Sequence, residues 1–362
     1  MLMVVLVLIV FSIFYLEKSK SKPLSNNKDV QQLKASESNA QVNENDLKRI
    51  AEKEKKYPKA VELVEPDGYI NTGNLTLREL VGKKVILLDF WTYSCINCQR
   101  TLPYLTSWYE HYKDQGFVIV GVHTPEFNFE KEYDNVQKAV KKFNITYPVV
   151  LDNNYYTWQA YKNRYWPRKY LIDIDGFVVY DHIGEGGYLE TEDKIIDLLK
   201  ERDEIFGLSS KMSDKIKILD VKTSLLKEIN TPEIYFGYSF SRNQMGNSQG
   251  WQPLEVVDYI LPVKIEKNKF YLEGQWKNNA DNMEVVGPIG KIILSYDAKD
   301  VNLVAGSKSH LKVISTVDQI KTKETTIQDF SLYPVVEGKD YGEHTLELTL
   351  PQGAMVYTFT FG

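Results

Sequence analysis

The pattern of hydrophobic and polar positions divides the chain into two regions with different periodicity. Between residues 60 and 207, short apolar runs alternate with segments in which large apolar residues recur at helical spacing. The run Val85–Trp91 is apolar apart from Asp89, which is typical of a strand buried on both faces. Residues 98–115 show helical spacing that ends at Gly116. Strands that alternate with helices predict an α/β fold with parallel strands at the centre of its sheet.

The other elements of this region follow from the same two periodicities. We expect a small hairpin around Gly73, a short charged helix over residues 46–56 before it, and a closing helix over residues 192–200. Further strands are predicted at residues 117–123, 148–151, 170–173 and 177–182, and further helices at 130–143 and 157–162.

From residue 215 to the end of the sequence, helical spacing gives way to short alternating segments separated by Gly, Asn, Asp and Pro. This pattern predicts an all-β domain, either a two-sheet sandwich or a jelly roll. The predicted strands are residues 233–238, 269–275, 291–295, 301–304, 311–314, 344–350 and 355–361.

The length and composition are sufficient for two domains, each with its own hydrophobic core. Of its 362 residues, 43 % are hydrophobic and 26 % are charged. A formal net charge of −5 argues against nucleic acid as a partner. Because the sequence has only two cysteines, no disulfide framework supports the fold, and core packing has to stabilise it.

The two cysteines, Cys95 and Cys98, lie where the apolar strand runs into the predicted helix. A cysteine at a helix N-terminus meets unpaired backbone N–H groups and the helix dipole, both of which stabilise a thiolate. The spacing therefore favours thiol–disulfide exchange. Three other interpretations stay open. If the two cysteines were half of a zinc site, the other ligands would have to be further cysteines or two closely spaced histidines. If they formed a structural disulfide, its loop would be too short to constrain the unfolded chain much. A peroxidase would have its attacking cysteine in a loop that contains proline and threonine. Thr92 lies three residues before Cys95, but no proline precedes Thr92.

Asp89 is the one ionisable residue in the predicted buried strand. Such a side chain is costly in an apolar environment unless it serves a purpose. Burial would raise the pKa of its carboxyl group and allow Asp89 to take or return the proton of Cys98. The alternative is a carboxylate that caps a nearby strand end.

The apolar residues at the start of the sequence are the basis for predicting where the protein is located. Residues 1–16 are apolar apart from Ser12, and they lack both a basic start and a small-residue cleavage site. We therefore expect an uncleaved single-pass membrane anchor, followed by a polar, flexible linker over residues 17–59. Three lysines within residues 18–22 would favour a cytoplasmic C-terminus by the positive-inside rule. We still expect the redox domain on the extracytoplasmic side, because such tethers are common for extracytoplasmic redox domains.

Several strings in the sequence resemble the DipZ family. They are WTYSCINCQRTLP at residues 91–103, GVHTPE at 121–126, LDNNY at 151–155, RYWP at 164–167, TPE at 231–233 and YDAKDV at 296–301. The inserted segment at 117–145 resembles TlpA-type thioredoxin folds. The resemblance covers residues 60–362. It implies a thioredoxin-like domain at 60–207, followed at 215–362 by a β-sandwich of the jelly-roll or carbohydrate-binding-module kind.

This resemblance also implies a function. A DipZ-like chain is a thiol–disulfide oxidoreductase without a cofactor, and it exchanges with thiols and disulfides of exported proteins. DipZ-type proteins carry a polytopic CcdA-like domain before the thioredoxin domain, whereas this sequence has one short apolar segment there. A separate CcdA-like membrane protein would then supply the electrons. Thr101 stands where TlpA relatives often have an acidic residue, so no proton-transfer role is carried over to it.

Individual roles follow from the same resemblance. Cys95 is the attacking sulfur and Cys98 the resolving one. Pro167 matches the cis-proline of thioredoxin folds, which aims the preceding backbone at the substrate; the alternative is a proline that starts a strand. The other residues expected around the sulfurs, as rim residues or as residues that tune the reduction potential, are Trp91, Tyr93, Trp166, Ile96 and Asn97. The three aromatic residues among them fit the core equally well.

Other residues have weaker functional expectations. His123 and Glu126 follow a parallel strand at its C-terminal end, where ordinary loop residues are the stronger expectation. Trp251 and Trp276 could form a platform for cell-wall glycan, although aromatic residues on strands are more often core residues. The alternatives to the oxidoreductase are therefore a thiol peroxidase and a glycan-binding protein whose β-sandwich carries the main function.

Overall fold

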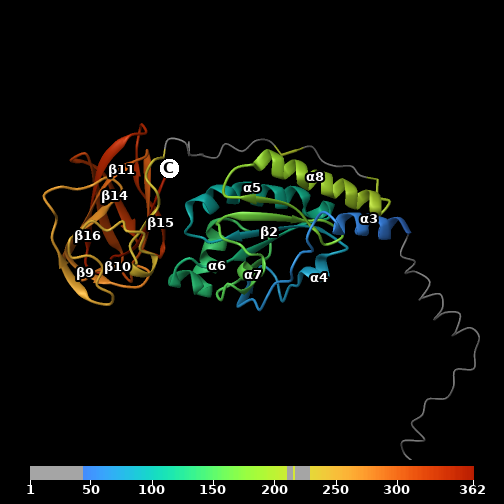
Figure 1. The fold of residues 1–362 in the computed structure, drawn as a ribbon, viewed down its shortest axis with the longest axis horizontal. Helices are drawn as coiled ribbons and strands as arrows, with labels where there is room; N and C mark the ends of the chain where they lie inside the picture. The colour runs from blue at the N-terminus through green and yellow to red at the C-terminus, as the bar shows by residue number, and fades with distance from the viewer. Residues whose placement is uncertain (1–43, 210–214, 217–228) are drawn as a thin grey trace, which may run out of the picture. The chain divides into compact units, whose positions relative to one another are not determined.

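The computed structural model describes residues 44–209, 215–216 and 229–362 (Figure 1). The expected membrane anchor, residues 1–16, lies outside these residues, as does most of the expected linker. Within the described ranges, no helix combines the length and the apolar character needed to cross a bilayer. The chain divides into two compact units, with the boundary between Lys56 and Tyr57. The described part of the first unit contains the predicted charged helix as α3, Glu44–Glu54, and none of these eleven residues is buried.

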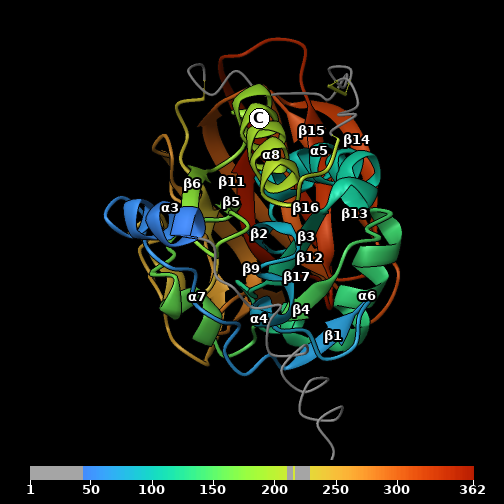
Figure 2. The ribbon, with the colours of Figure 1, turned by 90° about the vertical axis from the view of Figure 1, so that its right-hand side faces the viewer.

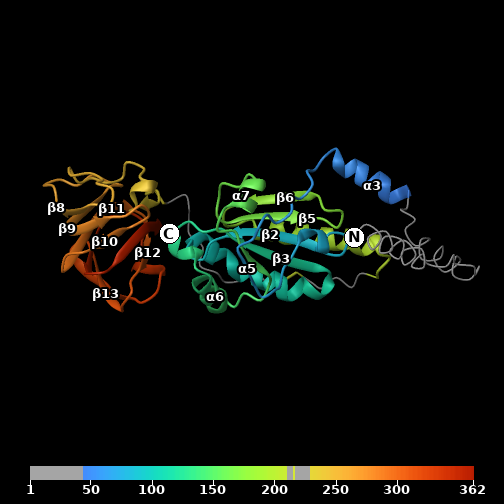
Figure 3. The ribbon, with the colours of Figure 1, turned by 90° about the horizontal axis from the view of Figure 1, so that it is seen from below.

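The first half of the second unit is built on a six-stranded sheet with the order β1-β4-β3-β2-β5-β6. The strands are β1 Gly68–Ile70, β2 Val85–Trp91, β3 Phe117–His123, β4 Val149–Leu151, β5 Arg168–Ile172 and β6 Val178–Ile183. Strands β2, β3 and β4 run parallel, whereas β5 is antiparallel to β2. Figure 3 shows β6, β5, β2 and β3 next to one another in this order. The predicted hairpin around Gly73 is wrong, because β1 pairs with β4 instead.

Helices cover both faces of this sheet. The helices α5 Ile96–Tyr112, α6 Tyr133–Lys142 and α8 Tyr188–Ile205 share one hydrophobic core with β2, whereas α4 Leu77–Leu80 and α7 Tyr156–Ala160 contribute to the other. In Figure 2, α5 and α8 lie on one side of the sheet, and α4 and α7 lie on the other. Along β2, alternate side chains enter the two cores, so both sets have to be apolar. This two-sided burial explains the continuous apolar run, and with it the α/β prediction is confirmed as a thioredoxin-like fold.

The second half of the unit, from Thr231 onward, is all-β. Its strands are β7 Ile234–Tyr235, β8 Val256–Tyr259, β9 Phe270–Asn278, β10 Met283–Val285, β11 Ile289–Asp297, β12 Asp300–Gly306, β13 Leu311–Val317, β14 Ile320–Ile327, β15 Ser331–Glu337, β16 Glu343–Pro351 and β17 Met355–Phe361. They follow the path β14-β13-β16-β11-β9-β10-β17-β12-β15, with β7 beside β17 and β8 beside β9.

The two layers of this domain share strand β9. Its first residues pair with β11 and its last residues pair with β10. The change of layer falls at Gly274, which has φ +89°, and a Cβ atom there would lie 2.7 Å from the carbonyl oxygen of Ile289. The end strands of the path, β14 and β15, are separated by residues 328–330 only. The predicted all-β domain is confirmed, but its sheet is continuous and nearly barrel-like instead of forming two separate sheets.

Candidate active site around Cys95 and Cys98

Strand β2 and helix α5 place the cysteines, as the sequence pattern predicts. Cys95 is the N-cap residue of α5, and its Sγ accepts a hydrogen bond from the Cys98 N–H at 3.4 Å. Its carbonyl oxygen accepts the helical bond from the Gln99 N–H at 3.0 Å. The first turn of α5, all of it described, contains no acidic residue that would oppose a negative charge on the sulfur. The helix N-terminus therefore directs a backbone N–H group at the Cys95 sulfur, with no acidic side chain in the same turn.

Cys98 is placed differently. Both thiols are free in this structure, but Cys95 is half-buried and Cys98 is buried, with 1 % of its surface exposed. Burial, reinforced by the hydrogen bond to Cys95 and by the nearby Cys95 and Asp89, raises the pKa of the Cys98 thiol well above its usual value. One sulfur is thus reachable from solvent and the other is protonated behind it.

Asp89 lies in the middle of β2 and is 1 % exposed. Neither of its carboxylate oxygens has a hydrogen-bond partner among the residues that the structure describes. Burial raises its pKa to about 7, although the Lys169 ammonium acts in the opposite direction. A carboxyl group with this pKa can change its protonation state near neutral pH.

Lys169 is a site residue that the sequence analysis missed. It sits opposite Asp89 in the β2–β5 register, is fully buried, and donates a hydrogen bond from Nζ to the Gly184 carbonyl oxygen at 3.1 Å. Burial lowers its pKa, whereas the Asp89 charge raises it. Its only sequence signal is a lysine that follows Arg168 at the start of the strand after Pro167, and the pairing with Asp89 becomes visible only with the strand register.

A second missed residue, Glu130, fixes the loop before Cys95. It is completely buried and accepts hydrogen bonds from the Ser94 hydroxyl at 2.6 Å and the Ser94 N–H at 3.3 Å. Its other oxygen accepts from the N–H groups of Glu126 and Phe127, at 2.7 and 3.0 Å. Burial raises the pKa of Glu130. This carboxyl group ties the cysteine loop to the segment after β3, so Glu130 is a positioning residue.

Cys95 opens into a cavity of about 340 Å³. The cavity is lined from both domains of the second unit. The thioredoxin-like domain contributes Ser94, Cys95, Asn97, Glu126, Arg164, Tyr165 and Trp166. The β-domain contributes Glu233, Tyr235, Arg242, Val304, Thr358 and Thr360. The attacking sulfur of Cys95 is therefore covered in part by the β-domain.

The Trp166–Pro167 peptide bond is cis, as the resemblance implies. Pro167 is buried, and its carbonyl oxygen accepts a hydrogen bond from the Gly184 N–H at 2.8 Å. Trp166 is half-buried, lines the Cys95 cavity, and donates from Nε1 to the Thr124 carbonyl oxygen at 3.0 Å. Of the three aromatic residues expected at the rim, Trp166 is the one that the structure brings to Cys95.

Trp91 and Tyr93 are core residues instead. Trp91 is completely buried and Tyr93 is 3 % exposed, and neither lines the cavity that contains Cys95. The Tyr93 hydroxyl donates to the Phe330 carbonyl oxygen of the β-domain at 3.2 Å. Of the remaining two expected residues, Asn97 lines the Cys95 cavity, whereas Ile96 lines two neighbouring cavities.

Of His123 and Glu126, Glu126 lies in the loop after β3, as expected, whereas His123 still belongs to the strand. His123 is the last residue of β3 and is completely buried, with its ring between those of Trp91 and Tyr93. Burial lowers its pKa to about 3, so it stays neutral near pH 7. Glu126 lines the Cys95 cavity and accepts a hydrogen bond from the Tyr235 hydroxyl at 2.7 Å. Burial and the nearby Glu233 and Glu130 raise its pKa to about 8.

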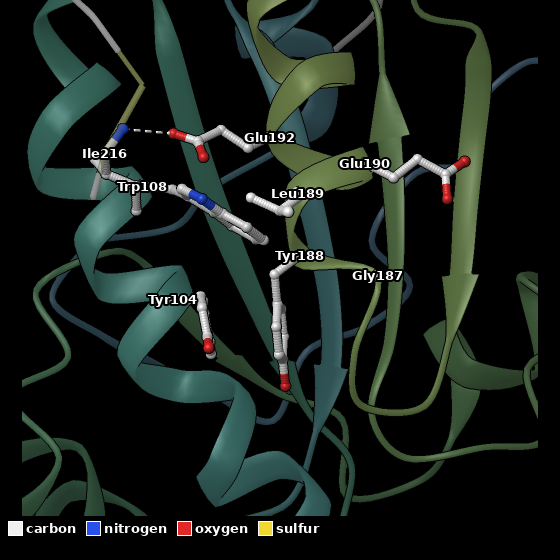
Figure 4. Close-up of a pocket in the computed structure, with 8 residues that line it drawn as sticks. All are labelled: Tyr104, Trp108, Gly187, Tyr188, Leu189, Glu190, Glu192 and Ile216. Atoms are coloured by element: carbon white, nitrogen blue, oxygen red, sulfur yellow. Dashed lines mark hydrogen bonds between the residues drawn. The ribbon is translucent and has the colours of Figure 1, made fainter. Parts of the chain in front are cut away.

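A second cavity, of about 350 Å³, lies between α5 and α8 (Figure 4). Tyr104 and Tyr188 stack face to face there, with ring centroids 3.6 Å apart. Glu192 accepts hydrogen bonds from the Ile216 N–H at 2.9 Å and the Tyr112 hydroxyl at 2.8 Å. Neither cysteine lines this cavity, so it is separate from the thiol chemistry.

Two family models match the chain. The AhpC/TSA family matches residues 58–181, and a thioredoxin-like C-terminal domain matches residues 231–362. Protein DipZ of Mycobacterium bovis and that of Mycobacterium tuberculosis are each 39 % identical to the chain over 302 residues. This alignment covers 82 % of the chain and 41 % of DipZ, so the chain spans about two fifths of the length of these relatives.

Shorter relatives match the thioredoxin-like domain. Thiol-disulfide oxidoreductase ResA of Halalkalibacterium halodurans is 32 % identical over 127 residues, which cover 35 % of the chain and 68 % of ResA. Among solved structures, StoA from Bacillus subtilis is 23 % identical, with 37 % of this chain and 97 % of that chain covered and a TM-score of 0.32. The resemblance to DipZ is confirmed, and through its first domain the chain belongs to the thioredoxin-like thiol-disulfide oxidoreductase family that includes ResA.

Proposed function

We propose that the chain catalyses dithiol–disulfide exchange through Cys95 and Cys98. One observation carries this proposal: a half-buried sulfur caps α5, and a buried thiol lies one helical turn behind it. The unpartnered carboxylate of Asp89 adds a group whose pKa, about 7, suits proton exchange with the buried thiol.

The reaction proceeds in two balanced steps. In the first, the Cys95 thiolate attacks one sulfur of a substrate disulfide. The substrate S–S bond breaks, a mixed disulfide forms, and the released substrate thiolate takes a proton from solvent. In the second, Cys98 gives its proton to Asp89 and attacks Cys95 Sγ. The mixed disulfide breaks, and the second substrate sulfur leaves as a thiolate that takes a proton from solvent. The substrate is then reduced by two electrons, the chain holds a Cys95–Cys98 disulfide, and Asp89 releases its proton to solvent. The reverse sequence oxidises a substrate dithiol.

Cysteine variants test this proposal. We expect Cys95→Ser to reduce insulin disulfides no faster than buffer with dithiothreitol, because the attacking sulfur is lost. Cys98→Ser should instead accumulate a mixed disulfide with the substrate, detectable by mass spectrometry as an adduct released by reductant. Normal insulin turnover in Cys95→Ser, or no adduct in Cys98→Ser, would refute the assignment.

The match to the AhpC/TSA family favours a thiol peroxidase as the second candidate. A peroxidase needs only the attacking sulfur and an external thiol, so Cys98→Ser would keep peroxide turnover. We expect that variant to lose catalysis of both disulfide and peroxide reduction. A peroxide assay with Cys98→Ser and excess dithiothreitol separates the two functions.

The setting of the reaction is proposed from sequence alone. Residues 1–16 would anchor the chain, residues 17–59 would act as a spacer, and the domains at 60–207 and 215–362 would face the extracytoplasmic side. Exported proteins would then be the substrates and a separate CcdA-like membrane protein the electron donor. Digestion of intact cells or spheroplasts with an added protease tests the orientation, because only extracytoplasmic domains would be cut.

A glycan role for the β-domain has less support. Trp276 is completely buried in the β-domain core, and half-buried Trp251 packs against that core, with its ring 5.8 Å from that of Phe270. These two tryptophans do not form the exposed platform that the sequence suggested.

A further inference from the structure

We propose that the β-domain forms the second wall of the substrate site, and that the site takes an extended peptide segment next to a disulfide. This inference rests on the proposed function, because it names the substrate class of the same Cys95 site. The peptide can belong to a small molecule of the cystine kind or to an unfolded stretch of a protein. The shared chemistry is an amino-acid backbone around a sulfur–sulfur bond.

The space at Cys95 is elongated. The cavity of about 340 Å³ at Cys95 adjoins one of about 190 Å³, and both are lined by Asn97, Glu233 and Thr360. Small-molecule sites span roughly 300–1,000 Å³, so the cavity at Cys95 is large enough for a few amino-acid residues. A disulfide within a flexible, extended segment can enter, whereas a disulfide held in a globular surface meets the β-domain first.

Strand β17 supplies the wall that faces Cys95. Its alternation places Phe359 and Phe361 in the β-domain core, whereas Thr358 and Thr360 line the cavity on the other face. The Thr358 hydroxyl is satisfied within the domain, since it donates to the Ile234 carbonyl oxygen at 2.9 Å. Thr360 is 5 % exposed, yet its Oγ1 has no hydrogen-bond partner in the described part of the chain. A buried hydroxyl without a partner is rare and points to a ligand group that completes it.

The charges around the cavity also suit a peptide. Arg164 and Arg242 are exposed and line it together with the carboxyl groups of Glu126 and Glu233. The Tyr235 hydroxyl lies 2.7 Å from Glu126 and 3.1 Å from Glu233, although it has only one proton to donate. Guanidinium groups, carboxyl groups and a tyrosine hydroxyl are therefore available within one cleft. This arrangement matches a ligand with amide N–H groups, carbonyl groups and charged ends, and it fits poorly to a ligand with charges of one sign.

The test compares three disulfides at equal concentration with the full chain: cystine, an unstructured octapeptide disulfide, and the same disulfide sequence held in a stable folded domain. We expect the octapeptide to be reduced at least tenfold more efficiently, in kcat/KM, than the folded domain, with cystine between them. Thr360→Val keeps the shape of the side chain and removes the hydroxyl. It should lower kcat/KM for the octapeptide about fivefold through KM, because one buried hydrogen bond is lost. The rate of Cys95 alkylation should not change.

Two further variants keep the result interpretable. Thr349→Val on β16 is the matched control, since this threonine lines neither cavity and should leave all three efficiencies unchanged. Glu233→Gln is a second probe in case Thr360→Val does not fold, and it should also raise KM for the octapeptide. Equal efficiencies for the octapeptide and the folded domain, or an unchanged KM in both probe variants, would overturn the inference while leaving thiol exchange intact. A chain that reduces none of the three disulfides would instead overturn the proposed function itself.

Discussion

Asp89 is the residue at which the stability and the chemistry of this protein conflict. Its carboxyl group is buried without a hydrogen-bond partner among the described residues, so its ionised form is destabilised by desolvation. An apolar or amide side chain would fit the strand at lower cost. The carboxyl is useful only if a proton has to move near Cys98, whose thiol is protonated by burial. We therefore interpret Asp89 as a functional residue that lowers the stability of the fold.

The first prediction concerns stability as a function of pH. The pKa of Asp89 is raised from 3.8 to about 7 in the folded protein. The unfolded chain therefore ionises first as pH rises, so the stability contributed by this group is complete below about pH 4 and is lost as pH rises through 7. The loss amounts to roughly 4 kcal/mol. Asp89→Asn should remove it and be more stabilising at pH 8 than at pH 4, as measured by urea unfolding.

The exposed Asp258 provides the control for that experiment. Asp258→Asn should change the free energy of unfolding by less than about 0.5 kcal/mol at both pH values. If the effect of Asp89→Asn were the same at pH 4 and pH 8, the raised pKa of Asp89 would be incorrect.

The second prediction concerns Lys169. Its ammonium is the group that lowers the pKa of Asp89 against the effect of burial. Lys169→Met should therefore raise the pKa of Asp89 and move the pH at which Cys98 resolves a mixed disulfide to higher values. Stopped-flow measurement of the resolution step across pH 5–9 reads this shift. Lys312→Met, at an exposed position on β13, should leave the profile in place, and a downward shift in Lys169→Met would contradict the pairing.

At the scale of the elements, the β2–α5 connection depends on where α5 begins and ends. The helix begins after Cys95 and gives way to a short 3-10 turn, Lys113–Gln115, which ends at Gly116 with φ +96°. This left-handed residue lets the chain turn into β3, whose neighbour β2 carries Asp89. The start of the helix therefore fixes the position of the Cys95 sulfur. Its end fixes where β3 begins, next to the strand that carries Asp89.

The third prediction tests the C-terminal end of this helix. Gly116→Ala forces a non-glycine residue into the left-handed region, and its Cβ would lie 2.4 Å from the Arg202 guanidinium. We expect a loss of about 1–2 kcal/mol in the free energy of unfolding. Cys95 alkylation should stay unchanged, because the other helix end is intact. Gly73→Ala, where a Cβ meets nothing within 4 Å, should be neutral when both variants are measured by urea unfolding. A neutral Gly116→Ala would contradict this explanation of the turn.

Local pattern predicted the elements that carry the cysteines, because β2 is buried on both faces and α5 keeps one apolar stripe. It missed β8, β10, β14 and β15. These strands are short, or they have exposed positions that weaken the alternation of apolar and polar residues. The roles of Lys169, Glu130 and Tyr235 could not be predicted either, since each depends on a partner far away in the sequence. For the same reason, Trp91 and Tyr93 could not be assigned to core or rim from the sequence.

At the scale of the whole molecule, the thioredoxin-like domain and the β-domain share one compact unit from Tyr57 to Gly362. Aromatic residues from both domains pack together, and Phe129 contacts Tyr357 and Phe330 with ring centroids 4.6 and 5.4 Å apart. The Asn128 N–H also donates to Asp281 of the β-domain at 3.1 Å. These contacts hold the second wall over Cys95.

The fourth prediction follows from this packing. The unit should unfold in a single calorimetric transition. Tyr357→Ala removes a ring that is 4 % exposed, and it should lower the free energy of unfolding by about 3–5 kcal/mol and split the transition in two. Tyr156→Ala, at a ring that is 43 % exposed, is the control and should preserve one transition. Two independent transitions in the unaltered protein would show that the domains do not depend on each other.

The central claim is that Cys95 is the reactive sulfur and Cys98 the protonated, shielded one. The most direct test is residue-resolved alkylation of the fully reduced chain at pH 7. The protein is pulsed briefly with iodoacetamide, quenched, and mapped by mass spectrometry. We predict that Cys95 is labelled at least a hundredfold faster than Cys98. Equal labelling of the two sulfurs, or faster labelling of Cys98, would contradict the account.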